Sequence, residues 1–398
     1  MHQKPKHELA QVVQQFYSSY EALHAPNGYI IKTLKAVEHC RTAYLGGHID
    51  VCSNCAEVHI SYNSCRNRHC PKCQQTNKEK WLDMLRSKVV PVPYFHTVFT
   101  LPHELNGLCM AYPTLMYDLL FSSVWQTIKT FAADAKQGNI TTGMTAVLHT
   151  WGQQLMLHPH LHCIIPSGGI TKNGKWKYFK GKGKFLFYIP NIQKVYASIF
   201  IAGLQQLISD KKIAPQCPTL FKILRSKKWV VYAKQKFGSP EIVIEYLGRY
   251  THKVAISNHR IKDVTDNSVT FNYKDYADKS KQKLLTLSGT EFIRRFTLHI
   301  LPKGFLKIRH YGLHSSGSCK KWKAIQATVF HIQPMAEQTK DWKQVCIEKW
   351  DYNPDVCKHC NEATKVRLYK IPTGLSPPHI KKMVHAITKT NKTEQIIS

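Results

Sequence analysis

A cysteine-rich stretch between residues 39 and 75 constrains the fold of this chain more than any other feature. It contains two Cys-x2-Cys pairs, Cys52/Cys55 and Cys70/Cys73, separated by 14 residues, which is close to zinc-ribbon spacing. Each pair places two thiolates on one tight turn, and two such turns complete a tetrahedral site. Thirteen cysteines without a secretion signal also favour metal ligation over disulfides. The sequence therefore predicts a small zinc-binding module.

The same stretch holds further side chains that bind zinc, enough for a second ion. They are Cys40, Cys65, His48, His59 and His69. Spacing does not decide which four side chains bind which ion, and a cross-braced arrangement stays open. The expected role is structural, because a closed four-ligand site has no open position for catalysis. A later pair, Cys357 and Cys360, hints at another knuckle that has no partner nearby in sequence.

The chain carries a large excess of positive charge. Lys and Arg number 56 against 25 Asp and Glu, a formal net charge of +31 that is not confined to one tail. Such a charge favours a polyanionic partner, and nucleic acid is the first candidate. An anionic membrane and the ribosome are alternatives, but no amphipathic basic helix favours a membrane. In the zinc module, Arg66, Arg68 and Lys72 are candidate DNA contacts.

The composition and segment pattern predict a globular α+β protein in the cytoplasm. Hydrophobic residues make up 43% of 398 residues, no apolar run is long enough to span a membrane, and the N-terminus lacks a signal-peptide core. Helical and strand-like segments mix without βαβ regularity. Residues 1–38 are predicted to be helical, and 92–102, bounded by prolines, to form a strand. Ser239 followed by Pro240 predicts a helix start.

Three histidines lie within the strand-like sequence LMLHPHLHCIIPSGG, residues 155–169. His160 and His162 point to the same side of a strand, with Leu161 on the other, so the two imidazoles can hold one divalent ion. The alternative is that they only form hydrogen bonds. His158 precedes the proline, and its role stays open.

Two tyrosines lie on one face of a predicted helix in EYLGRYTHKV. Tyr246 and Tyr250 are four residues apart, a spacing at which tyrosines often only pack. Here Arg249 and Lys253 surround them with charge that suits a phosphate. A tyrosine hydroxyl can attack phosphorus covalently when a cation polarises the phosphate. A metal held by the histidines would supply that cation.

These motifs resemble those of a known family. HPHLHC followed by a Tyr-x3-Tyr helix resembles the HUH endonucleases, in the order found in rolling-circle replication initiators. SCRNRHCPKCQ, VFTLPHEL and YLGRYTHKVAISN are similar to the two-tyrosine rolling-circle transposases of bacterial insertion sequences, the IS-ninety-one group. The resemblance covers residues from about 10 to about 315.

The resemblance implies a fold, a division into domains and a set of site residues. The fold is an HUH-like central antiparallel sheet flanked by helices, with VFTLP beside the histidine strand, preceded by a small zinc domain. The expected parts are a helical start with the zinc domain, a catalytic domain and a basic region without an assigned role, over residues 1–90, 91–315 and 316–398. His160 and His162 would hold Mg or Mn, and Tyr246 and Tyr250 would be nucleophiles. HUH sites usually have a third ligand, and His149, Gln153, Gln154 and His158 are candidates. His149 is favoured because AVLHTW is expected to form the strand next to the histidine strand, although a core histidine is as good an interpretation.

The implied activity is DNA transposition. A tyrosine would attack single-stranded DNA at an element end or target, form a 5′-phosphotyrosine and free a 3′-hydroxyl that host replication can extend. Arg249 and Lys253 are candidate DNA contacts. One alternative is a plasmid or phage rolling-circle replication initiator with the same chemistry. Another, from a different class, is a non-catalytic zinc-dependent DNA-binding regulator.

Overall fold

The computed structural model describes residues 4–86, 89–134, 139–181, 186–237, 240–332, 341–362 and 365–374. It divides into two compact units that are both discontinuous in sequence. Unit 1 takes residues 1–80, 256–297 and 339–398, and unit 2 takes residues 81–255 and 298–338. The sequence-based division at residues 90 and 315 stays a prediction. Every helix among the described residues is too short or too polar to span a bilayer.

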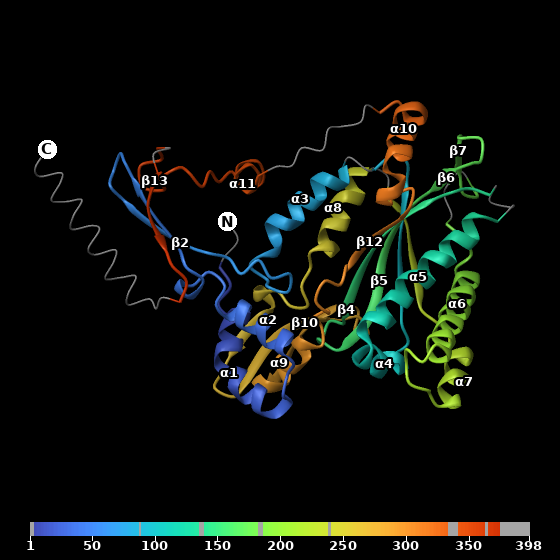
Figure 1. The fold of residues 1–398 in the computed structure, drawn as a ribbon, viewed down its shortest axis with the longest axis horizontal. Coiled ribbons are helices and arrows are strands. Elements are labelled where there is room, and N and C mark those ends of the chain that lie inside the picture. The colour runs from blue at the N-terminus through green and yellow to red at the C-terminus, as the bar shows by residue number, and fades with distance from the viewer. Residues whose placement is uncertain are drawn as a thin grey trace, which may run out of the picture. The chain divides into compact units, whose positions relative to one another are not determined.

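A five-stranded antiparallel sheet forms the centre of unit 2 (Figure 1). Its strands, in spatial order, are β12 (Ile308–Gly312), β4 (Gly143–Trp151), β5 (Leu157–Pro166), β3 (Tyr94–Thr100) and β8 (Val231–Phe237). The histidine-rich strand β5 lies in the middle, and β3, which ends within the VFTLP sequence at Thr100, pairs directly with it. The expected α+β class with an antiparallel sheet flanked by helices is therefore confirmed.

Helices cover one face of this sheet and bury its larger apolar core. They are α4 (Asn106–Ala111), α5 (Pro113–Ala132), α6 (Ile189–Ser209) and α7 (Pro218–Ser226). Leu161 and Cys163 of β5 belong to this core, together with Leu120 of α5 and Phe200 of α6. Because side chains alternate along a strand, the residues between them on β5 point to the opposite face.

The opposite face carries a smaller apolar core under α8 (Pro240–Thr251), α10 (Cys319–Phe330) and the Trp81–Arg86 part of α3 (Gln74–Arg86). Ile164 of β5 packs in this core with Val243 and Ile244 of α8. Pro240 occupies the first position of α8, where its missing N–H costs nothing. The predicted cap residue, Ser239, lies outside the described residues. This packing places α8 over the face that carries His160 and His162.

A short hairpin, β6 (Gly168–Ile170) and β7 (Trp176–Tyr178), follows β5.

The N-terminal part of unit 1 contains two helices, α1 (Leu9–His24) and α2 (Gly28–Glu38), where one helical region was predicted. The chain breaks between them because Ala25 adopts a left-handed conformation, with φ of 39°. Asn27 then caps α2, since its side-chain oxygen accepts the N–H groups of Tyr29 and Ile30.

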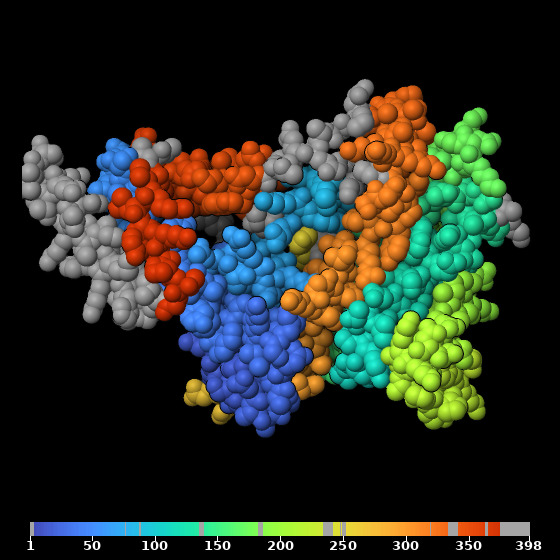
Figure 2. All heavy atoms as spheres, in the orientation of Figure 1, coloured from blue at the N-terminus to red at the C-terminus, as the bar shows by residue number. Residues whose placement is uncertain are grey.

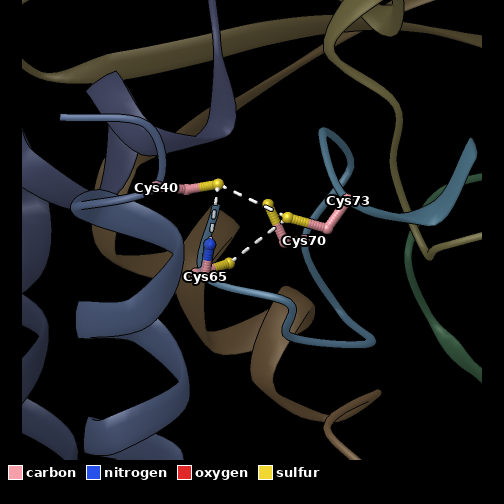
Figure 3. A group of neighbouring side chains, drawn as sticks. All are labelled: Cys40, Cys65, Cys70 and Cys73. Carbon is pink, nitrogen blue, oxygen red and sulfur yellow. Dashed lines mark hydrogen bonds between the residues drawn. The ribbon is translucent and has the colours of Figure 1, made fainter. Parts of the chain in front are cut away.

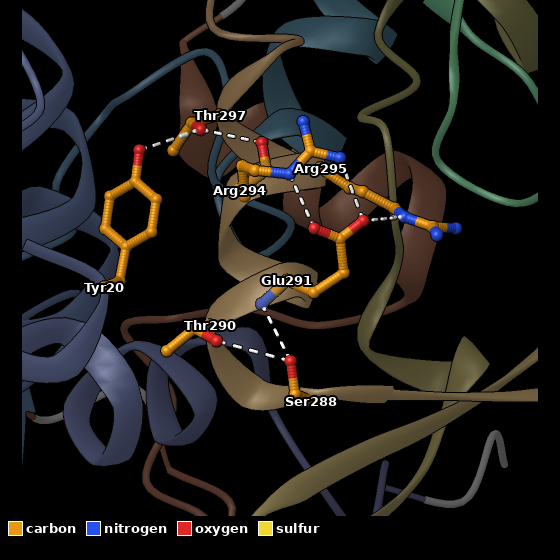
Figure 4. A network of polar contacts seen from close by, with 7 residues as sticks. All are labelled: Tyr20, Ser288, Thr290, Glu291, Arg294, Arg295 and Thr297. Atoms are coloured by element: carbon orange, nitrogen blue, oxygen red, sulfur yellow. Dashed lines mark hydrogen bonds and ion pairs between the residues drawn. The ribbon is translucent and has the colours of Figure 1, made fainter. Parts of the chain in front are cut away.

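Helix α9 (Gly289–Thr297) packs against α1 in unit 1. It follows a three-stranded sheet formed by β9 (Ile261–Val264), β10 (Ser268–Asp275) and β11 (Lys281–Ser288). The Tyr20 hydroxyl bonds Thr297, and Glu291 forms ion pairs with Arg294 and Arg295 (Figure 4). The hydrogen bond from Arg294 is the main reason why the pKa of Glu291 falls to about 2. The Tyr20–Thr297 hydrogen bond joins α1 to α9, and the ion pairs of Glu291 lie within α9.

A second three-stranded sheet in unit 1 joins segments that are far apart in sequence. Its order is β13 (Lys365–Ile371), β1 (Gly47–Cys52) and β2 (Val58–Tyr62), and both pairings are antiparallel. Helix α11 (Trp342–Trp350) precedes β13 along the chain. The C-terminal region, for which the sequence suggested no role, therefore supplies an edge strand to the cysteine-rich module.

A buried histidine makes the stability of unit 2 sensitive to pH. His299 is 2% exposed, its Nε2–H donates to the Leu155 carbonyl (3.1 Å), and its Nδ1 accepts from the Thr150 hydroxyl (3.2 Å). Burial lowers the pKa of His299 from 6.5 to about 4. The fold favours the neutral ring, so this stabilisation is complete above pH 6.5 and is lost as the pH falls towards 4.

We expect His299→Gln to remove this pH dependence, because glutamine keeps a donor but does not titrate. The difference in unfolding free energy between wild type and variant should shrink by up to about 3 kcal/mol from neutral to acid pH. Denaturant unfolding of both proteins across this range measures it. If the difference in unfolding free energy between the two proteins stays constant with pH, His299 does not have a lowered pKa in the folded protein.

Candidate active site and zinc-binding cysteines

Three histidines from two neighbouring strands meet on the α8 face of the central sheet. His160 and His162 lie on β5, and His149 lies on β4 directly opposite His160. One ring nitrogen from each of the three lies within 4.8 Å of the others, and His149 and His162 are buried. The structure thus brings the candidate third ligand into the group with the two histidines of the HPHLHC motif.

Hydrogen bonding and burial keep these rings as neutral imidazoles, the form in which a histidine can bind a metal. His160 Nδ1–H donates to the backbone carbonyl of His158 at 2.6 Å, which leaves the Nε2 lone pair for an ion. Burial, as the largest cause, lowers the pKa of His160 to about 4 and holds the pKa of His162 well below its usual range. The charge of Lys253 adds to both shifts. Neutral rings keep the lone pairs that coordination requires.

The group of three imidazoles does not suit Mn²⁺ and Mg²⁺ equally well. Mn²⁺ accepts imidazole nitrogen more readily than Mg²⁺ does, but both ions favour oxygen ligands. Three protein ligands also leave coordination positions for phosphate oxygens. The donor set therefore fits Mn²⁺ better than Mg²⁺, and for either ion phosphate and water oxygens would supply the remaining positions.

A fourth histidine, His96 on β3, connects this group to the tyrosine helix. Its Nε2 lies 3.0 Å from His162 Nδ1, and its Nδ1 lies 3.1 Å from the Tyr246 hydroxyl. The His96 and His162 rings stack at 5.2 Å, and the Tyr246 ring meets His96 edge-on at 4.8 Å. The sequence interpretation missed His96. The available signal was its position in the predicted strand at 92–102, two residues before Val98, which pairs with His162.

Helix α8 carries both predicted nucleophiles. Tyr246 is half-buried and points its hydroxyl towards His96. Tyr250 follows one turn later in the same helix, but its side chain and that of Arg249 lie outside the described residues. Lys253 is exposed just beyond the helix, and its backbone carbonyl accepts a hydrogen bond from Lys307. Tyr246 is thus the predicted nucleophile that the structure places beside the histidines.

The cysteines of the module form a first four-thiol group in unit 1. Cys40 follows α2, and Cys65, Cys70 and Cys73 precede α3, with the four sulfurs close together (Figure 3). Cys73 Sγ lies 3.5 Å from Cys40 Sγ and 3.6 Å from Cys65 Sγ. Hydrogen bonds from these thiols, that of Cys40 first, lower the pKa of Cys73. A set of four neighbouring, partly buried thiols is typical of structural zinc.

The spacing of the two Cys-x2-Cys pairs predicted that they complete one tetrahedral site. In the structure the two pairs belong to different groups. Cys52 and Cys55 instead form a second four-thiol group with Cys357 and Cys360. The reason is the β1–β2 hairpin, which places its turn next to the C-terminal segment through the β1–β13 pairing. Sequence spacing cannot reveal a partner that lies some 300 residues away.

The remaining zinc and DNA candidates of the module have other neighbours. His48 pairs with Asp50 at 3.2 Å, and His69 Nε2 accepts from Arg68 at 3.4 Å, outside both four-thiol groups. Lys72 pairs with Glu8 at 2.5 Å, and Arg66 has a positive φ of 53°. DNA contact by Arg66, Arg68 and Lys72 stays a prediction.

Comparisons with known proteins match both parts of the chain. Residues 12–101 match a family described as "Transposase zinc-binding domain", and residues 143–323 match one described as "Putative transposase". The "Putative transposase y4qJ" of Sinorhizobium fredii is 40% identical over 317 residues, 77% of this chain and 79% of the relative. The "Transposase for insertion sequence element IS801" of Pseudomonas savastanoi pv. phaseolicola is 27% identical over 310 residues, 73% of this chain and 72% of the relative. No solved structure matches.

Proposed function

Because this chain belongs to the IS91 family of insertion-sequence transposases, we propose that it cuts and joins single-stranded DNA through a tyrosine–phosphate bond. One observation carries the proposal. The Tyr246 hydroxyl is linked through His96 to a group of three histidines that suits a divalent ion. A nucleophile beside a phosphate-polarising centre is the arrangement that phosphoryl transfer to tyrosine needs.

His149, His160 and His162 would hold Mn²⁺ or Mg²⁺, which supplies positive charge to the scissile phosphate when bound. If His162 ligates through Nε2, its Nδ1–H donates to His96 Nε2. His96 then carries its proton on Nδ1 and donates it to the Tyr246 oxygen. That hydrogen bond favours the negative charge that develops on the oxygen as it loses its proton. His96 is in this way a positioning residue for the nucleophile.

The chemical step balances without a cosubstrate. The Tyr246 oxygen forms a bond to phosphorus, and the bond from phosphorus to the 3′-oxygen breaks. The tyrosine proton passes to water, and the leaving 3′-oxygen takes a proton from water. The products are a 5′-phosphotyrosine and a free 3′-hydroxyl, which a host polymerase can extend in a rolling-circle process. Tyr250 on the same helix offers a second nucleophile, which permits strand transfer without release of a broken end.

DNA recognition is expected close to this site. Lys253 is exposed beyond α8, and its charge contributes to the lowered pKa values of His160 and His162, so it is near enough to the histidine group for this proposal. With Arg249 it would contact the phosphates flanking the cut. Single-stranded element ends and target DNA are the proposed substrates, as the resemblance to the two-tyrosine rolling-circle transposases implies.

A covalent-capture assay tests the proposal. Full-length protein is incubated with Mn²⁺ or Mg²⁺ and an oligonucleotide from the element end, labelled at its 3′ terminus. We expect a labelled protein adduct that resists denaturation, requires the metal and maps to a peptide containing residues 240–251. The same sequence as a duplex should give little adduct. Binding without any adduct would overturn the proposal and favour a DNA-binding regulator.

The replication-initiator alternative shares this chemistry and differs in its substrate. An adduct with an origin sequence but not with insertion-sequence ends would support it. The two relatives are both named as transposases, and the second is assigned to an insertion sequence. We therefore favour transposition.

A further inference from the structure

A turn at the end of strand β1 has the backbone geometry of a metal-binding knuckle. Its sequence is CSNCAE, residues 52–57. Cys52 N–H donates to the Glu57 carbonyl (3.0 Å), and Ala56 N–H donates to the Cys52 carbonyl (2.8 Å). Ala56 adopts the left-handed region, with φ of 57°. These bonds hold Cys52 and Cys55 on one tight turn.

A turn near the C-terminus has the same two backbone hydrogen bonds. Its sequence is CKHCNE, residues 357–362, which matches CSNCAE at both cysteines and at the glutamate. Cys357 N–H donates to the Glu362 carbonyl (2.9 Å), and Asn361 N–H donates to the Cys357 carbonyl (2.9 Å). Asn361 is left-handed with φ of 60°. Two segments far apart in sequence therefore form the same knuckle.

The two knuckles face each other. Cys52 Sγ lies 3.5 Å from Cys360 Sγ, and Cys55 Sγ lies 3.6 Å from Cys357 Sγ. Four sulfurs at about 2.3 Å from one zinc ion are about 3.8 Å apart in a tetrahedron, whereas a disulfide needs about 2.05 Å. Strand β13 runs beside β1, with Lys365 opposite Cys52. Figure 2 shows the red atoms of this segment against the blue atoms of the N-terminal part.

We propose that Cys52, Cys55, Cys357 and Cys360 bind a zinc ion of their own, distinct from the ion at the Cys40 group. This ion joins the knuckles at residues 52–57 and 357–362 into one zinc ribbon, whose sheet consists of β1, β2 and β13. His59 Nε2 lies 3.2 Å from Cys357 Sγ, so its N–H can donate to the thiolate and orient it. The role of the C-terminal segment is to complete this ribbon.

Zinc stoichiometry of cysteine variants tests the proposal. By native mass spectrometry, wild-type protein should bind two zinc ions, and both Cys52→Ser/Cys55→Ser and Cys357→Ser/Cys360→Ser should bind one. The variant with all four changes should also bind one, because the two pairs share an ion. Cys346→Ala, in the same C-terminal segment but outside the group, should keep two. The proposal is overturned if the four-cysteine variant loses both ions while Cys346→Ala keeps two. It is also overturned if Cys357→Ser/Cys360→Ser still binds two ions.

Thiol labelling of the wild-type protein keeps the test valid if a variant fails to fold. In the zinc-loaded protein, Cys357 and Cys360 should resist alkylation together with Cys52 and Cys55, and chelation should expose all four in one step. Exposed Cys217 should react throughout. Cys357 and Cys360 that react as fast as Cys217 in the zinc-loaded protein would refute the site, whatever the variants do.

Discussion

Replacing Tyr246 by phenylalanine is expected to lower the rate of covalent adduct formation with single-stranded DNA by at least about 10³-fold. The variant removes the oxygen that would attack phosphorus. It keeps the ring that packs edge-on against His96 at 4.8 Å, so the fold of α8 should not change. The rate is measured from single-turnover capture of a 3′-labelled oligonucleotide, with melting temperature as the check on folding.

Two further variants separate chemistry from side effects. Tyr188→Phe, at an exposed tyrosine before α6, should form the adduct at the wild-type rate. Any residual adduct in Tyr246→Phe is assigned to Tyr250 and should vanish in Tyr246→Phe/Tyr250→Phe. If that double variant still forms an adduct, neither tyrosine is the nucleophile and the proposed chemistry is wrong.

The sequence predicted the local part of the candidate active site, named His149 on a neighbouring strand as a possible member, and missed His96. His160 and His162 share a face because alternation along a strand is a local rule. His149 was a candidate only because its strand was expected to lie next to β5, and the register that puts it opposite His160 is visible in the structure. His96 lies 66 residues before His162, and no local pattern marks the ring that joins Tyr246 to the histidines.

The cysteines show the same limit. Each Cys-x2-Cys turn is a local motif, so the sequence predicts the knuckles correctly. Which knuckles meet depends on the β1–β13 pairing, which joins Gly47 to Ile371 and is invisible to spacing arguments. The similarity of CSNCAE and CKHCNE was the available signal. Comparing knuckle sequences with one another, as well as counting the residues between them, would have found the partner.

Replacing His160 by alanine is expected to have the second large effect. The ring offers its Nε2 to the ion while its Nδ1–H is held by the His158 carbonyl, so its loss removes an oriented ligand. We expect the affinity for Mn²⁺, and the rate of adduct formation at limiting Mn²⁺, to fall by more than about 100-fold. Calorimetric titration with Mn²⁺ measures the affinity, and single-turnover capture over a series of Mn²⁺ concentrations measures the rate.

His158→Ala is the matched control, because alanine keeps the backbone carbonyl that orients His160. This variant should retain the wild-type affinity for Mn²⁺ and the wild-type rate. His149→Ala then decides between the two interpretations of that residue. A loss comparable to that of His160→Ala makes His149 the third ligand, whereas unchanged affinity makes it a packed core histidine. If His160→Ala binds Mn²⁺ and forms the adduct as well as wild type does, the histidines do not hold the catalytic ion. Tyr246 would then need another source of positive charge for the scissile phosphate.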